Sequence, residues 1–206
     1  MPRRMADPAF RAAQEAGRYA PHVRPINEMV DALRGGARGW LPHVAPLHGG
    51  TTARVLSILR DPGPATRDGA GSGFLCIEND DPTAERQLQM FTDVGIGAAD
   101  ITPWNAYPWY INAAPGAAQL DAGVAPLVQL IELMPDIRVV FLQGAHARAG
   151  WERLARRHPA PARRVEKVVA TFHPGRQALF HRDPEVRCAR AEHRESAYRD
   201  VAAVIR

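Results

Sequence analysis

Strand-like and helix-like segments alternate along the chain. Four short runs are rich in Val, Ile and Leu and are closed by polar residues or by Gly and Pro, as buried strands are. These runs are Ala53–Leu59, Ala99–Thr102, Ile137–Gln143 and Val165–Phe172. Such strands alternating with helices are typical of a parallel sheet, so the pattern predicts an α/β fold.

Apolar residues recur at helical spacing between and around these strands. The clearest case is Ala117–Met134, where Leu120, Val124, Leu127 and Leu130 fall on one helical face. The other expected helices are Pro25–Arg34, Thr83–Val94, Gly150–Arg157 and Ala189–Arg206. We expect residues 21–206 to form one domain, preceded by a loose or helical N-terminal arm over residues 1–20.

The composition is that of an ordinary folded protein. Of the 206 residues, 46% are hydrophobic and 23% are charged, and a chain of this length can bury a core of its own. The sequence contains no apolar run near the roughly 20 residues that cross a bilayer, and its first residues do not form an apolar signal core. We expect a cytoplasmic monomer that has no membrane partner.

Sequence motifs for metal and nucleotide cofactors are missing. The two cysteines are too few for a disulfide framework or a four-thiolate metal site. The acidic group Glu78, Asp80 and Asp81 precedes a predicted helix, which it would open. The glycines of Gly69–Gly73 lack the lysine and the following helix of a phosphate-binding loop. We therefore expect neither a metal nor a cofactor.

The charge is divided unevenly along the chain. The formal net charge is +4, yet residues 138–206 hold 15 basic and seven acidic residues, a net +8. Such a basic block indicates a polyanionic partner, chiefly nucleic acid. All but one of the 26 basic residues are arginine, and a high-GC genome is an alternative explanation for that preference.

Polar residues follow several predicted strands. In an open parallel sheet ligands bind beyond the carboxyl ends of the strands, where Asp61, Asn105 and His173 fall. A carboxylate in the rigid Pro-Gly-Pro turn can orient a water, an amide can read a donor–acceptor edge, and an imidazole can donate to a leaving group. Each residue also has a purely structural alternative: Asp61 could form a turn, Asn105 could cap a loop, and His173 could be a packed histidine. Asn112 is the alternative to Asn105 if the second strand is longer.

Four segments at these strand ends resemble the motifs of the uracil-DNA glycosylase superfamily. Leu59–Pro64 resembles its first motif, and the Trp-Asn-Ala-Tyr-Pro segment around Asn105 resembles the one that holds its base-reading asparagine. Val139–Ala147 is similar to its third-strand segment, and Phe172–Gly175 to its His-Pro-Ser motif. The resemblance covers roughly residues 53–180. It implies a three-layer α/β/α sandwich around a four-stranded parallel sheet.

The resemblance also implies an activity. The chain would be a monofunctional DNA glycosylase that flips uracil or a related damaged base out of DNA, hydrolyses its N-glycosidic bond and leaves an abasic site for base excision repair. Asp61 would position water, His173 would hydrogen-bond the departing base, Phe74 would stack on the base and Asn105 would read its edge. The implied partner is DNA that contains a damaged base, with no obligate protein partner and a location at the nucleoid.

The chain departs from the family pattern at several positions. Leu59 stands in place of the first-motif glycine, and Arg60 in place of a small or amide residue. Gly63 replaces a tyrosine that excludes 5-methyl groups, which implies room for thymine-like or oxidised pyrimidines. The loop after His173 is similar to the family's minor-groove wedge, although glycine replaces its serine. Its DNA-binding residues would be Gly175, Arg176, Gln177 and Leu179.

Two other functions remain open. A non-catalytic nucleic-acid or nucleotide-binding protein on the same fold would not need Asp61, Asn105 and His173 together. A hydrolase of free nucleosides would not need a basic C-terminal region. The dependence on salt concentration distinguishes a DNA-binding protein from a hydrolase of free nucleosides. The affinity for DNA falls steeply as the salt concentration rises, whereas the rate of free-nucleoside hydrolysis does not.

Overall fold

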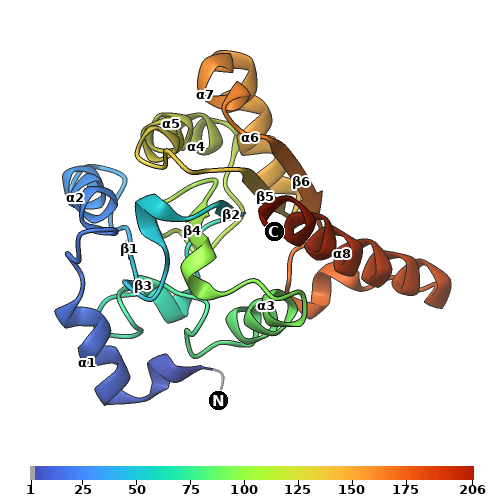
Figure 1. Ribbon diagram of the computed structural model, residues 1–206, viewed down its shortest axis with the longest axis horizontal. Coiled ribbons are helices and arrows are strands. Elements are labelled where there is room, and N and C mark those ends of the chain that lie inside the picture. Colours follow the sequence, from blue (N-terminus) through green and yellow to red (C-terminus); the bar gives the residue numbers. More distant parts are fainter. Residues whose placement is uncertain (1–2) are drawn as a thin grey trace.

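A parallel four-stranded sheet lies at the centre of the protein (Figure 1). The structure is a computed structural model that describes residues 3–206. The strand order is β4-β2-β5-β6, with β2 at Val55–Leu59, β4 at Ile101–Asn105, β5 at Val139–Gln143 and β6 at Lys167–Thr171. The predicted α/β class is therefore confirmed.

Strand β4 departs most from its predicted bounds. The pattern placed its end at Thr102, before Pro103, whereas the strand continues to Asn105. Proline lacks a backbone N–H and is tolerated at the edge of a sheet, and β4 is an edge strand. Asn105 is therefore the last residue of β4, in register with Leu59 of β2, and not a residue of the following loop.

Helices pack on both faces of the sheet (Figure 1). Because side chains alternate along a strand, Val139 and Phe141 of β5 enter one hydrophobic cluster and Val140 and Leu142 enter another. The first cluster includes residues of α3 (Pro82–Asp93) and α8 (Pro184–Ile205). The second includes residues of α2 (Arg24–Leu33), α5 (Val124–Glu132) and α6 (Ala145–Arg157). The buried faces of the sheet thus fix the helices that frame its carboxyl ends.

The single helix expected over Ala117–Met134 is split in two. Helix α4 (Ala117–Ala122) ends at Ala122, α5 begins at Val124, and Gly123 lies between them. A Cβ at Gly123 would lie 1.9 Å from the carbonyl oxygen of Ala106. The glycine therefore lets this junction approach the backbone that follows β4.

The N-terminal segment contacts the rest of the protein. It holds a 3-10 turn, η1 (Arg4–Ala6), and helix α1 (Pro8–Ala16). The backbone N–H of Met5 donates to the Glu78 carbonyl at 3.0 Å, and the Gln14 side chain accepts from the Leu47 N–H at 2.9 Å. The first two residues of the arm expected over residues 1–20 lie outside the described residues.

Several short elements complete the chain. A second parallel sheet, not expected from the sequence, pairs β1 (His43–Val44) with β3 (Phe74–Leu75). The remaining elements are η2 (Gly50–Thr52), η3 (Pro64–Thr66), η4 (Ala98–Asp100), α7 (Pro159–Arg163) and η5 (Arg176–Leu179). Within residues 3–206, none of the helices combines the length and apolar character that crossing a bilayer requires.

Candidate active site

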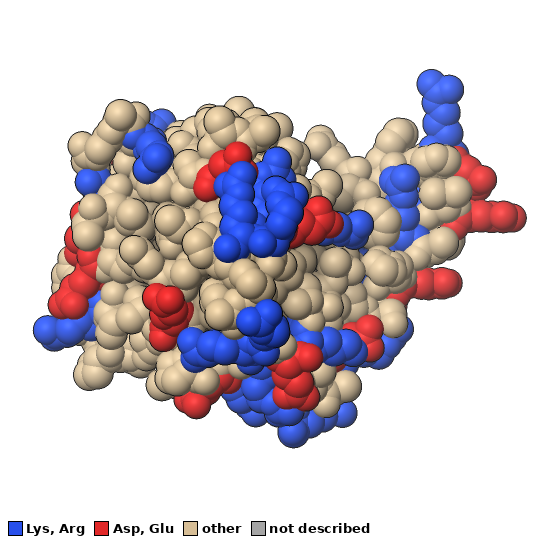
Figure 2. Space-filling view, turned by 90° about the horizontal axis from the view of Figure 1, so that it is seen from above, with Lys and Arg blue, Asp and Glu red and all other residues tan. Residues whose placement is uncertain are grey.

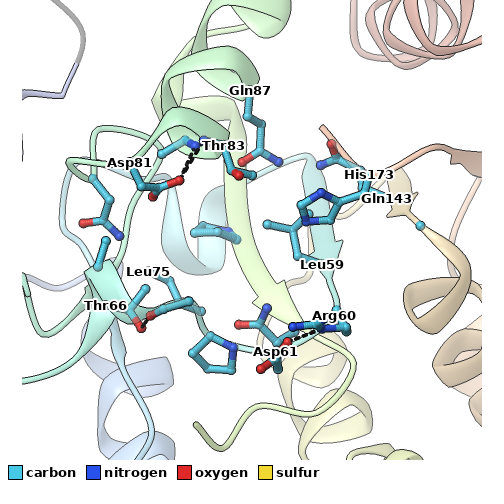
Figure 3. Close-up of a pocket in the computed structure, with 18 of the residues that line it drawn as sticks. Leu59, Arg60, Asp61, Thr66, Leu75, Asp81, Thr83, Gln87, Gln143 and His173 are labelled. Carbon is cyan, nitrogen blue, oxygen red and sulfur yellow. Dashed lines mark hydrogen bonds and ion pairs between the residues drawn. The ribbon is translucent and has the colours of Figure 1, made fainter. Parts of the chain in front are cut away.

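A cavity of about 710 Å³ lies at the carboxyl ends of the four central strands (Figure 3). Asp61 follows β2, Asn105 ends β4, Gln143 ends β5 and His173 follows β6, and all four residues line the cavity. Parallel strands bring their carboxyl ends to one edge of the sheet. The structure therefore brings together the three polar residues that the sequence singled out, Asp61, Asn105 and His173.

The Asp61 carboxylate is buried, and among the described residues one of its two oxygens has a hydrogen-bond partner. Its side chain is 3% exposed, and its Oδ1 accepts from the Arg60 guanidinium. Its Oδ2 is buried and has no hydrogen-bond partner among the described residues. The following Pro62 restricts the backbone of Asp61, and the contact with Arg60 orients the carboxylate. A buried carboxylate oxygen is costly without a partner, which makes Oδ2 the natural place for a water or a substrate.

Asn105 presents an amide at the end of β4. Its side chain is buried, and its Oδ1 has no hydrogen-bond partner among the described residues. An amide offers an acceptor and two donors side by side, which suits it to read a base edge. Asn112 also lines the cavity, but it is exposed. The buried Asn105 is therefore the better placed of the two to read a bound group.

His173 is a neutral hydrogen-bond donor. Its Nδ1 accepts from the Gly175 N–H at 3.0 Å, so the proton of the neutral ring lies on Nε2. Burial lowers the pKa of His173 to about 4, and the positive charges of Arg60 and Arg194 act in the same direction. A Cβ at Gly175 would lie 3.0 Å from Nδ1 of His173, so glycine leaves room for this contact. Near pH 7 the ring offers an Nε2–H without a charge.

Two buried glutamines also line the cavity, and neither was expected from the sequence to be a site residue. Gln87 of α3 and Gln143 of β5 donate to the Ser57 hydroxyl at 3.1 and 2.8 Å. The Tyr198 hydroxyl of α8 donates to Oε1 of Gln143 at 2.7 Å. Gln143 carried a signal in the sequence, because it is the polar residue that ends an apolar strand. Gln87 carried none, since its helix is polar along most of its length.

Phe74 does not lie where the resemblance expected it. It is fully buried, does not line the cavity and belongs to a small cluster with Met5, Ala45 and Cys76. Successive side chains of a strand point to opposite sides, and in β3 it is the next residue, Leu75, that lines the cavity. The stacking role expected of Phe74 is therefore not supported. Leu75 contributes to the apolar lining of the cavity together with Leu59, Ile77 and Trp104.

The residues expected to contact DNA lie in and beside η5. Of these, Gln177 lines the cavity, whereas Gly175, Arg176 and Leu179 do not. Arg176 is exposed and Leu179 is half-buried. Their neighbour Phe180, which nothing in the sequence singled out, is 71% exposed. Gln177 is thus the one residue of the four expected in the wedge that lines the cavity.

Gly63 lies in the cavity wall with open space in front of it. It lines the cavity, and a Cβ built there would meet no atom within 4 Å. Its backbone is extended, with φ of −78°, so a larger residue would be free of backbone strain. The absence of a side chain at this position therefore enlarges the cavity.

The basic side chains do not form one uniform surface. Figure 2 shows basic and acidic side chains interspersed on the face seen from above. Asp121 of α4 pairs with Arg153 and Arg157 of α6, at 2.9 and 3.0 Å. Nearer the cavity, Arg86 and Arg194 donate to the carbonyl of Pro174, next to His173. Part of the positive charge of residues 138–206 is thus balanced within the protein, and part lies beside the cavity.

Within residues 3–206, the structure contains no cluster of three or more His, Cys, Asp or Glu side chains arranged to hold a metal ion. Neither a scan against protein-family models nor a search of curated proteins found a match to this chain. What the protein does must therefore be inferred from the chemistry of the cavity.

Proposed function

We propose that the protein is a monofunctional DNA glycosylase that hydrolyses the N-glycosidic bond of uracil or a related damaged base in DNA. Its fold would then be the glycosylase form of the three-layer α/β/α sandwich. One observation carries the proposal: a free carboxylate oxygen of Asp61, a free amide of Asn105 and a neutral Nε2–H of His173 meet in one cavity. Binding of a phosphate alone would need none of these groups.

The reaction needs opposite charges to be stabilised at two places. As the bond between C1′ and the base nitrogen breaks, the sugar becomes positive and the base negative. Asp61 Oδ2 is suited to orient the water that bonds to C1′ and to stabilise the positive sugar. His173 Nε2–H is suited to donate to the base oxygen on which negative charge develops. The bond electrons leave with the base, which ends protonated by the proton that the water loses.

The cavity also fits recognition of an extruded base. A base within a duplex cannot reach the end of a sheet, so it must be flipped out of the stack. The Asn105 amide is suited to pair with the carbonyl and N–H edge of a base such as uracil, and Leu75 is one of the apolar lining residues available to contact the base in place of Phe74. The open space at Gly63 leaves room for a substituent on C5 of the ring.

A base-release assay tests the proposal. Purified protein is incubated with oligonucleotides that carry one uracil, hypoxanthine, xanthine or 5-hydroxymethyluracil, single- and double-stranded, and abasic sites are then cleaved with alkali. We expect product from at least one substrate and a loss of about 100-fold or more in Asp61→Asn and in His173→Ala. Matched controls are Asp68→Asn and His158→Ala, both exposed and outside the cavity. No product from any substrate, or full activity in both cavity variants, would contradict the proposal.

A further inference from the structure

Phe180 is the most exposed large hydrophobic side chain of the described residues. It is 71% exposed, against 41% for Val168 and 38% for Tyr19. A single exposed hydrophobic residue is common on protein surfaces. What sets Phe180 apart is the combination of a fixed backbone, a position beside the cavity and cationic neighbours.

The backbone of Phe180 is held on both sides. Its N–H donates to the Gln177 carbonyl at 3.1 Å, and its carbonyl accepts from the Arg190 guanidinium of α8 at 2.8 Å. The same guanidinium lies over the Phe172 ring, 5.5 Å from its centroid. The ring of Phe180 is thus presented to solvent from an anchored position rather than from a loose loop.

Phe180 lies two residues beyond the last cavity-lining residue of its segment, Ala178. It follows η5 (Arg176–Leu179), and two residues of this turn, Gln177 and Ala178, line the cavity. The same short segment links His173 to Phe180. A chain-like ligand that has one unit in the cavity and continues along η5 would reach the Phe180 ring.

The surroundings of the ring favour an anionic ligand. Arg176 and Arg182 flank it in the sequence and are exposed, and neither forms an ion pair within the described part of the chain. The nearest acid in the sequence, Asp183, is engaged as the N-cap of α8, where it accepts from the Glu185 N–H. An exposed aromatic ring between free cations is the arrangement that proteins use to bind single-stranded nucleic acid.

We propose that Phe180 is a stacking platform for an unpaired base of single-stranded DNA, next to the nucleotide that occupies the cavity. The position of that neighbour rests on the proposed function, whereas the stacking itself requires only DNA. Bases within a duplex have both faces covered, so a fixed ring outside the cavity meets a free base face in a single strand. The phosphates that flank this base would be contacted by Arg176 and Arg182, the exposed arginines on either side of Phe180 in the sequence.

Binding experiments on DNA without a lesion test the platform. Affinity is measured by fluorescence anisotropy with a labelled oligothymidine, with the same strand carrying abasic spacers, and with a duplex. We expect Phe180→Ala to bind the oligothymidine about tenfold more weakly, with little change on the spacer strand or the duplex. Phe180→Trp should retain the affinity and show indole quenching, beyond that of the wild type, when the oligothymidine binds. Val168→Ala, which also removes an exposed hydrophobic side chain, serves as the matched control.

Two results would overturn the platform: equal binding of oligothymidine by wild type and Phe180→Ala, or an effect of Phe180 restricted to the duplex. Base release is measured separately on the same proteins. Phe180-dependent binding without any base release would overturn the glycosylase and support the platform. Base release together with unchanged binding in Phe180→Ala would overturn the platform and support the glycosylase.

Discussion

Arg60 connects the two groups that carry the proposed chemistry. Its guanidinium pairs with Oδ1 of Asp61, which leaves Oδ2 directed to other partners. Its positive charge also contributes to the low pKa of His173, after burial and together with Arg194 of α8. In the sequence Arg60 stands out only because it departs from the motif that Leu59–Pro64 resembles. In the structure it is a residue that orients the carboxylate and helps to keep the imidazole neutral.

Replacing Arg60 should therefore change the titration of His173. In Arg60→Gln the pKa of His173 should rise from about 4 toward its ordinary value, because a nearby positive charge is lost while burial and Arg194 remain. The measurement is an NMR titration of the His173 ring protons. Arg60→Lys, which keeps the charge, is the matched control and should titrate close to wild type. An unchanged pKa in Arg60→Gln would show that Arg60 does not act on His173.

At the scale of elements, close contacts between backbones shape the cavity. The junction of α4 and α5 approaches the residue that follows β4, and β4 carries Asn105 at its end. Gly123 makes this approach feasible, because any side chain there would collide with the Ala106 carbonyl. The break in the helix is thus linked to the placement of the amide in the cavity.

Gly123→Ala should destabilise the protein by about 3 kcal/mol, because the added methyl group forces two backbones apart. The measurement is urea unfolding followed by circular dichroism. Gly36→Ala is the control, since a Cβ there meets no atom within 4 Å. If the two variants unfolded at the same urea concentration, the contact with Ala106 would not matter for stability.

At the scale of the whole molecule, burial makes stability depend on pH. His48 is fully buried, and its Nε2 accepts from the Ile77 N–H at 3.3 Å. Burial lowers the pKa of His48 to about 4 from an ordinary value of 6.5. The unfolded chain therefore binds a proton below pH 6.5 that the folded protein binds only below about pH 4. Stability is fully present above pH 6.5 and falls as the pH drops from 6.5 to 4.

We expect His48 to account for a loss of roughly 3 kcal/mol across this range. The measurement is urea unfolding at several pH values between 7 and 4, for wild type and His48→Gln. The glutamine variant starts from a lower stability but should lose less of it on acidification, because it has no proton to gain at this position. Equal losses in the two proteins would rule out His48 as a source of the acid sensitivity.

The sequence by itself determined the α/β class and the three polar residues of the cavity, Asp61, Asn105 and His173. Both follow from local pattern, because an apolar strand and the polar residue at its end are neighbours in the chain. Only the tertiary structure decided that Phe74 points away from the cavity, that Gln87 points into it and that Phe180 is exposed. These outcomes depend on which face of an element meets a segment distant in the sequence, and no local pattern carries that information.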